Sequence, residues 1–361
     1  MSKIKYYSLE RIKKEKAQYN VIFGKRSNGK TYAILSEILE NYVRNKKQGA
    51  YIRRWQTDIK GLSSTIFDGH IANGFIEELT HGEWTSVYFY SRRWYLCRTD
   101  PETKQRIVDS NPFCFSFSLS DMEHDKSTSY PNVTTIFFDE FLTRSIYLRD
   151  EFILFCNVVS TIKRLRTDVV IYMAGNTVNQ YCPYFAEMGL KNVQKMKKNK
   201  IDVYTYGESN LKVAVERCDS TSCNKASDDY FAFNNPKLKM ITEGEWEFDI
   251  YPHLNEKFKS CNVLLNFYII FDNEKIAGNI IKTSENVVLY FYRKTTEIKD
   301  VDKSIIFGIT DSNPRHFKKL NGNKSKIPSK ISQFFINDRV FYDTNETGDI
   351  VYNYLNWCKI N

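Results

Sequence analysis

Residues 24–31 read Gly-Lys-Arg-Ser-Asn-Gly-Lys-Thr and match the pattern G-x-x-x-x-G-K-[ST] at every fixed position. A β-branched and aromatic stretch at 19–23 precedes the motif, and apolar residues at helical spacing follow it from 29 to 44. A strand, a glycine-rich loop and a helix N-terminus in this order direct backbone N–H groups at phosphates. The sequence therefore predicts a phosphate-binding loop in an α/β domain, although a plain glycine turn remains an alternative.

An apolar run at residues 133–138 leads directly into Asp139 and Glu140. At the end of a strand beside a phosphate-binding loop, the first carboxylate is expected to hold Mg²⁺ together with Thr31, and the second to orient and deprotonate an attacking water. We therefore predict ATP and Mg²⁺ as ligands and Glu140 as a catalytic residue. The predicted nucleotide-binding residues are Gly24, Lys25, Arg26, Ser27, Asn28, Gly29, Lys30, Thr31, Asp139 and Asn176, with Thr31 and Asp139 as metal ligands.

Two arginines follow a helical pattern at residues 150–163. Arg164 and Arg166 stand where cations are ordinary partners of a helix dipole. An arginine from a neighbouring subunit also commonly stabilises the charge that develops on a transferred phosphoryl group, so either residue is a candidate for that role. Asn176, after an apolar run at 169–174, could contact the γ-phosphate or the attacking water, or could cap a turn.

Strand and helix patterns alternate as far as residue 203, which is typical of an α/β domain with a mainly parallel sheet. Short alternating segments between residues 84 and 117 indicate an antiparallel insertion. A polar stretch with turn signals covers 207–235, and a β-meander pattern follows at 263–292. We predict a P-loop domain at residues 1–205, a linker region at 206–232 and a smaller α+β domain at 233–361.

The composition favours a polyanionic partner without requiring one. Lys and Arg number 52 against 43 Asp and Glu, which leaves a net charge of +9. Basic runs at residues 191–200 and 318–330 are either solvated surfaces or contacts to nucleic-acid phosphates. No apolar run is long enough to cross a bilayer and the first residues lack a signal-peptide pattern, so we expect a cytosolic protein without a membrane partner. The eight cysteines form no CxxC pair, which predicts buried thiols rather than a structural metal.

Several segments together resemble the DNA-packaging ATPases of small protein-primed tailed phages, the phi-twenty-nine type. The resemblance is carried by residues 19–32, 51–54, 126–127, 130–133, 135–141, 176 and 183–185, and it is weak beyond about residue 190. It implies an ASCE-type P-loop ATPase that forms a homo-oligomeric ring, expected to be a pentamer, and translocates double-stranded DNA into a procapsid. It also implies a packaging RNA as scaffold, action in the host cytoplasm at the portal vertex, and an RNase H-like C-terminal domain without nuclease activity.

The resemblance assigns roles to single residues. Lys30 and Thr31 match the Walker A residues of the family, Asp139 and Glu140 match the Walker B pair, and Arg164 matches the trans-acting arginine.

Other matches are less specific. Lys126 matches a lysine that acts between subunits, and Arg53 is assigned to glutamate or phosphate sensing; both, with Arg166, remain alternatives for the trans-acting role. The sequence departs from the family at Lys163, where an aromatic residue is expected, and across much of the insertion at residues 59–118.

The C-terminal domain decides between two packaging functions. Most large packaging ATPases carry a two-metal nuclease there, which needs several converging carboxylates. The strand expected at residues 264–269 has no Asp or Glu, and the remaining acidic residues are scattered: Asp249, Asp272, Asp311 and Asp343. The sequence thus favours a motor without cleavage. The alternatives are a terminase-like ATPase with an active nuclease, and a nucleic-acid-binding scaffold that uses nucleotide as a switch, against which Glu140 argues.

Overall fold

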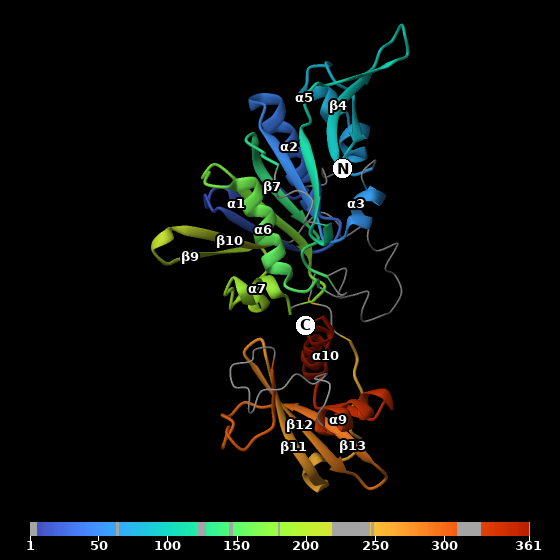
Figure 1. Cartoon of the computed structure of the whole chain (residues 1–361), viewed down its shortest axis with the longest axis vertical. Helices are drawn as coiled ribbons and strands as arrows, with labels where there is room; N and C mark the ends of the chain where they lie inside the picture. Colours follow the sequence, from blue (N-terminus) through green and yellow to red (C-terminus); the bar gives the residue numbers. More distant parts are fainter. Residues whose placement is uncertain are drawn as a thin grey trace, which may run out of the picture. The chain divides into compact units, whose positions relative to one another are not determined.

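The computed structural model describes residues 6–62, 65–121, 128–143, 147–179, 181–218, 246, 249–308 and 326–360. The chain divides into two compact units, Met1–Arg144 with Asp150–Trp246 and Ser145–Arg149 with Glu247–Asn361. Each unit contains its own sheet (Figure 1), and the two are described separately. Within the described ranges, no helix is both long and apolar enough to span a bilayer.

Strands and helices alternate in the first unit. Its strands are β1 (Tyr19–Gly24), β2 (Gln48–Arg53), β3 (Ser86–Tyr90), β4 (Arg93–Thr99), β5 (Arg106–Val108), β6 (Cys114–Ser118), β7 (Val133–Asp139), β8 (Val170–Asn176), β9 (Lys200–Tyr206) and β10 (Leu211–Cys218). Its α-helices are α1 (Glu10–Lys13), α2 (Lys30–Asn45), α3 (Gln56–Leu62), α4 (Asp68–Ala72), α5 (Phe75–Leu79), α6 (Glu151–Lys163) and α7 (Pro183–Glu187), with 3-10 turns at Val193–Lys195 and Gly207–Ser209.

The sheet of this unit has the order β3-β4-β6-β2-β7-β8-β1-β10-β9, with β5 beside β4. The strands from β6 to β10 in this order run parallel, whereas β3, β4, β5 and β9 add antiparallel pairs at the two ends. The predicted α/β class with a mainly parallel sheet and an antiparallel insertion is confirmed.

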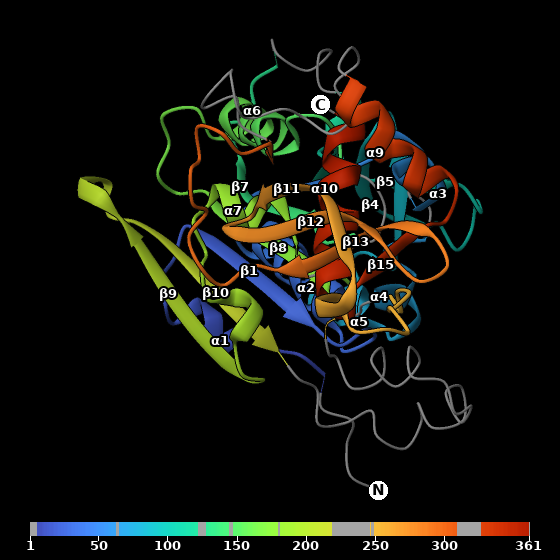
Figure 2. The same cartoon turned by 90° about the horizontal axis from the view of Figure 1, so that it is seen from below.

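Helices cover both faces of the sheet because neighbouring strand residues point to opposite sides. Phe137 belongs to the core cluster that contains Ile34 and Ile38 of α2. The adjacent Phe138 stacks on Phe155 of α6, with ring centroids 5.3 Å apart. Helices α2 and α6 therefore lie on opposite sides of the strands (Figure 2), and the unit has three layers.

The boundary of this unit differs from the prediction. Residues 211–218, expected within a linker at 206–232, form β10, which pairs in parallel with β1 along its whole length. Glu216 and Arg217 lie inside this strand, and each is buried against a specific polar partner rather than in apolar surroundings. Because these two residues are charged, the sequence pattern predicted a polar linker here instead of a buried strand. The remaining linker residues, 219–232, lie outside the described residues.

The first unit also extends further along the chain than residue 205. The indole of Trp246 stacks on Phe23 of β1, with centroids 5.2 Å apart, and its N–H donates to Gln194 O at 3.2 Å. The second unit therefore starts after Trp246 rather than at residue 233.

The second unit is a five-stranded sheet with two long helices. It contains β11 (Asn262–Phe271), β12 (Glu274–Lys282), β13 (Val287–Arg293), β14 (Ile306–Gly308), α9 (Lys326–Ile336), β15 (Val340–Tyr342) and α10 (Asn345–Ile360), with a 3-10 turn at Phe258–Ser260. The sheet order is β14-β11-β12-β13-β15, and β11, β12 and β13 form the predicted antiparallel meander. Strands β14 and β15 add parallel pairs at its edges. The smaller α+β class is confirmed.

One helix replaces part of an expected loop. Residues 326–330, assigned to a basic loop at 318–330, begin α9, whose Phe335 packs on Phe291 of β13. The lysines at the start of this segment indicated a charged loop, although the residues that follow them form an apolar helix face. Residues 318–325 lie outside the described residues.

Candidate functional site

The motif at residues 24–31 lies between the end of β1 and the start of α2, as predicted. Gly24 closes β1 against β10, because a Cβ at this position would lie 2.1 Å from Cys218 O. Gly29 has a φ of 90°, a left-handed conformation that glycine adopts without strain, and Lys30 starts α2 directly after it. The loop therefore presents the unpaired N–H groups of a helix N-terminus to an anion.

Residues outside the motif hold the phosphate-binding loop in place through hydrogen bonds. Asn28 donates from Nδ2 to Cys218 Sγ at 3.1 Å, and its carbonyl accepts the Tyr7 N–H at 2.9 Å. Tyr7 is fixed in turn, because its hydroxyl donates to Glu216 Oε2 at 2.7 Å. Lys25 is buried, whereas Arg26 and Ser27 are exposed at the outer side of the loop. No sequence pattern near the motif predicts that Tyr7 and β10 contact the loop.

The ammonium of Lys30 is buried among neutral oxygen atoms. Nζ donates to Lys25 O at 2.7 Å, to Asn28 Oδ1 at 3.1 Å and to Asn176 Oδ1 at 3.3 Å. Burial lowers the pKa of this lysine, and the charge of Asp139 works in the opposite direction. Because the three acceptors are amide and carbonyl dipoles, the positive charge is not neutralised locally and attracts an anion.

Asp139 ends β7 beside the first turn of α2. Its Oδ1 accepts the Thr31 hydroxyl at 3.2 Å, and its Oδ2 accepts the Tyr51 hydroxyl at 3.0 Å. Burial raises the pKa of Asp139, while Arg53, 3.5 Å from Oδ2, favours the ionised form. A hydroxyl and a carboxylate are ligands of the kind that Mg²⁺ prefers, so the pair fits the predicted ion.

Glu140 follows with a φ of 55°, an uncommon conformation for a residue that has a Cβ. This turn directs its side chain to the surface, where 56% remains exposed. Arg53, almost fully buried, donates to Glu140 Oε2 at 2.7 Å and also pairs with Asp58 at 3.5 Å. Arg53 therefore contacts the carboxylates of both Asp139 and Glu140.

Asn176 is the last residue of β8, the strand between β1 and β7. Its side-chain oxygen accepts from Lys30, so it faces the phosphate-binding loop instead of capping a turn. A strand between the P-loop strand and the strand that ends in Asp139 is the additional strand of ASCE-type proteins. A pocket of about 510 Å³ opens here and is lined by Tyr6, Ser27, Asn28, Gly29, Lys30, Thr31, Tyr32, Asn73 and Asn176.

Arg164 lies near the amino end of β7, away from the ends of the strands that carry the phosphate-binding loop. Helix α6 runs back from the carboxyl ends of the strands, and the Arg164 side chain donates to Thr128 O at 3.4 Å, shortly before β7 begins. Strand β7 begins shortly after this contact, and its seven residues span about 20 Å before they end at Asp139, so Arg164 lies at the opposite end of β7 from Asp139. Arg164 is exposed and does not reach its own phosphate-binding loop.

Arg166 has a different environment. It donates to Pro131 O at 2.7 Å and to Ile162 O at 3.2 Å, and it pairs with Asp168 at 3.5 Å. These contacts join the end of α6 to the segment before β7. Lys126, the third candidate for a role between subunits, lies outside the described residues.

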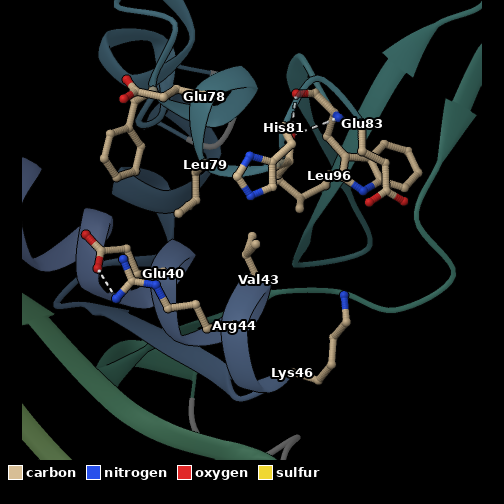
Figure 3. A pocket seen from close by; sticks show the side chains of 12 residues that line it. Glu40, Val43, Arg44, Lys46, Glu78, Leu79, His81, Glu83 and Leu96 are labelled. Atoms are coloured by element: carbon tan, nitrogen blue, oxygen red, sulfur yellow. Dashed lines mark hydrogen bonds and ion pairs between the residues drawn. The ribbon is translucent and has the colours of Figure 1, made fainter.

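A larger hollow, of about 820 Å³, lies away from the phosphate-binding loop (Figure 3). Val43, Leu79 and Leu96 face one another across it, and Glu40 pairs with Arg44 at 3.1 Å within α2. Its charges are spread along its rim and do not converge, so we assign it no chemistry. In the parts of the chain that the structure describes, no group of three or more His, Cys, Asp or Glu side chains could hold a metal ion.

The fold and the site together define a P-loop α/β domain followed by a smaller α+β unit. The chain belongs to the family described as Podovirus DNA encapsidation protein (Gp16), whose model matches residues 1–225. The resemblance found in the sequence is thereby confirmed.

Individual relatives agree with this assignment. The DNA packaging protein of Bacillus phage B103 is 26% identical over 174 residues, which cover 47% of this chain and 48% of the relative. The protein of the same name from Bacillus phage phi29 is 26% identical over 188 residues, 51% and 50% of the two chains. The chain thus matches about half the length of these curated relatives.

Two solved structures share the fold over nearly the whole chain. The bacteriophage Phi-29 viral genome packaging motor assembly aligns with a TM-score of 0.58 at 19% identity, covering 98% of this chain and 99% of that chain. The Phi-28 gp11 DNA packaging motor aligns with a TM-score of 0.55 at 17% identity, covering 99% and 98%.

Proposed function

We propose that this chain hydrolyses ATP and uses the energy to translocate double-stranded DNA into a procapsid. The observation that carries the proposal is the convergence of Lys30, Thr31, Asp139 and Glu140 at the carboxyl ends of two parallel strands, β1 and β7, with Arg53 contacting both carboxylates. A site that only stored nucleotide would have no need of a held carboxylate beyond the metal ligand.

Each residue has a distinct task in this proposal. Lys30 and the N-terminus of α2 bind the β- and γ-phosphates, and Asn176 lies beside Lys30 where the terminal phosphate is expected. Thr31 and Asp139 would hold Mg²⁺, which when bound supplies positive charge to the phosphate oxygens. Glu140 orients the attacking water and accepts its proton. Arg53 holds the Glu140 carboxylate until it turns toward that water.

The partners come from the relatives and the motor assemblies that this chain resembles. We propose a homo-oligomeric ring, a pentamer, that acts at the portal vertex of a procapsid in the host cytoplasm with a packaging RNA. Arg164 supports a ring, because it is exposed and lies at the opposite end of β7 from its own Asp139, so it is available to a neighbouring subunit.

For the second unit we propose an RNase H-like fold without cleavage activity. The meander with β14 parallel to β11 supports the fold relation. The lack of a metal-binding cluster among the described residues supports the loss of cleavage. Asp311, one of the scattered carboxylates, lies outside the described residues.

Turnover of ATP by the purified protein, with and without duplex DNA and procapsids, tests the proposal. Glu140→Gln should retain ATP binding and lower turnover by about 100-fold or more, because general-base catalysis contributes that much. Lys30→Ala should lose binding. Glu40→Gln, at an exposed ion pair of α2, is the control and should change neither.

The outcomes separate the functions. Wild-type turnover in Glu140→Gln would show that Glu140 is not the base. Binding without hydrolysis in the wild type would favour the scaffold alternative. If neither DNA nor procapsids alter the rate of hydrolysis, the result would support an ATPase but would contradict the proposed translocation of DNA.

A further inference from the structure

Arg54 lies directly behind the turn that carries Glu140, and 5% of it is exposed. It donates to Glu140 O at 3.2 Å, to Phe141 O at 2.8 Å and, through Nε, to Glu151 Oε2 at 2.8 Å. The guanidinium thus joins the residue that follows β2 to the turn at Glu140 and Phe141 and to Glu151, all more than 80 positions further along the chain. A lysine could not reproduce these contacts, because its ammonium lacks the planar fork.

The partner carboxylate is enclosed as well. The Glu151 side chain has no exposed surface, and its second oxygen accepts the Tyr184 hydroxyl at 2.9 Å. A buried ion pair is costly unless its geometry is good and its remaining atoms are hydrogen-bonded, and removing one partner leaves an uncompensated buried charge. The contacts of Arg54, Glu151 and Tyr184 meet that condition, so the cluster holds one fixed arrangement.

Arg53 and Arg54 hold Glu140 from two sides. Arg53 contacts the carboxylate, whereas Arg54 contacts the carbonyl of the same residue. The left-handed conformation of Glu140, with φ at 55°, is unfavourable for a residue that has a Cβ and persists only where surrounding contacts fix it. Arg54 supplies two of those contacts, and they fix the position of the backbone from which the Glu140 side chain extends.

The same cluster reaches the helix that ends at Arg164. Glu151 is the first residue of α6, and Arg164 follows its last residue. A 13-residue helix transmits displacement at one end to the other because its backbone is internally hydrogen-bonded. Helix α6 is thus attached at its N-terminus to the Glu140 turn and presents Arg164 at its C-terminus.

We propose that Arg54 is a positioning residue that makes the Glu140 turn and helix α6 move as one unit, so that the state of one nucleotide site sets the position of the arginine offered to the next. This inference rests on the proposed function. Arg54 itself touches no nucleotide in it; Arg54 acts through the Glu140 backbone and through Glu151.

The first test separates positioning from general stability. Arg54→Lys should lower kcat by about tenfold or more and leave the Kd of a non-hydrolysable ATP analogue within about twofold, since the phosphate contacts are unchanged. Arg217→Lys is the matched control, because Arg217 is equally buried and donates to Met196 O from β10, three strands away from β7 in the sheet order. Both variants are compared per nucleotide-binding subunit.

Equal kcat values for Arg54→Lys and Arg217→Lys would overturn the positioning role. If Arg54→Lys does not fold, Glu151→Gln is measured in the same way, because it keeps the shape of the side chain and removes its charge. It should show the same fall in kcat at unchanged Kd, and an unchanged kcat would overturn the proposal equally.

The second test examines the link to α6 in mixed rings. Arg164→Ala subunits keep an intact site and need an arginine from a neighbour. Glu140→Gln subunits should supply it and restore hydrolysis, whereas Arg54→Lys subunits should restore several-fold less because their α6 is displaced. Equal recovery with both partners would show that Arg54 acts on its own site alone. No recovery with Glu140→Gln would overturn the trans role of Arg164 in the proposed function, and the link with it, while the kinetic comparison still decides the positioning role.

Discussion

The two units of this chain bury charge in opposite ways. In the first, Arg53, Arg54, Asp139 and Glu151 are buried and each has a partner of opposite sign within 3.5 Å. In the second, the buried carboxyl of Asp349 on α10 lies near two other acidic residues. Burial and the nearby charges of Asp249 and Glu346 raise its pKa from 3.8 to about 7.

The difference indicates what each unit does. A network of paired charges is hard to maintain in an interior and gains little stability over apolar packing, so it is retained where fixed polar geometry is needed. A carboxyl with acidic neighbours takes up a proton instead and becomes a neutral group. The first unit therefore holds charged side chains in a fixed arrangement beside the phosphate-binding loop, as the proposed chemistry on a polyanion requires, whereas the environment of Asp349 in the second favours its neutral form.

The strongest test of the role of the first unit is to combine subunits that each lack a different half of the proposed site. Arg164→Ala and Lys30→Ala should each be inactive alone, with losses on the order of 1,000-fold where a trans-acting arginine is removed. Mixed rings should recover hydrolysis, because junctions of one polarity contain Lys30 from one subunit and Arg164 from the next. The measurement is ATP turnover across mixing ratios, with ring assembly checked by size.

A matched arginine controls for loss of charge. Arg44 on α2 is exposed and pairs with Glu40, so Arg44→Ala should keep wild-type turnover. Absence of recovery at every ratio would place Arg164 in its own site or in a structural role and turn attention to Lys126 and Arg166.

The phosphate-binding loop, the strand ending at Asp139 and the meander were predictable because their signals are local. Glycines at fixed spacing, an apolar run and alternating residues each depend on neighbours in the sequence. The hairpin between β11 and β12 is of the same kind, since Asp272 and Asn273 adopt the positive φ values, 49° and 64°, that a two-residue turn needs.

The contacts that hold the site together were not predictable because they join distant parts of the chain. Arg54 and Glu151 are 97 positions apart, and Tyr7 and Glu216 are 209 apart. Strand β10 was missed for the same reason. Glu216 and Arg217 are acceptable inside a buried strand only because Tyr7 and Met196 satisfy them, and no window around β10 contains those partners.

A change in pH should affect the two units differently. The pKa of Asp349 is raised in the folded state, so its ionisation favours unfolding as pH rises from about 4 to about 7, and the penalty is complete above that range. Asp349→Asn should therefore unfold like the wild type near pH 4. At pH 8 it should be more stable, by about 4 kcal/mol at most, because each of the roughly three units of the pKa difference corresponds to about 1.4 kcal/mol.

Urea unfolding at both pH values measures this effect. Asp338→Asn is the control, because Asp338 is exposed in the same unit and should give no difference that depends on pH. A stability gain for Asp349→Asn that is equal at both pH values would show that ionisation of Asp349 is not its cause.

The smallest expected effect is no cleavage of DNA by the second unit. A two-metal nuclease needs carboxylates that converge around ions about 4 Å apart, and among the described residues no three or more His, Cys, Asp or Glu side chains are grouped so that they could hold a metal ion. Asp272 lies in a hairpin turn, and Asp343 accepts the Arg293 N–H at 3.3 Å. Supercoiled DNA incubated with the purified protein in Mg²⁺ or Mn²⁺ should stay intact, as it should with Asp249→Ala and Asp311→Ala. Nicking that persists through purification and disappears in either variant would show that carboxylates of the second unit, Asp311 among them, assemble into a working metal site. The two units would then both be built for chemistry on a polyanion, and the terminase-like function would replace the motor without cleavage.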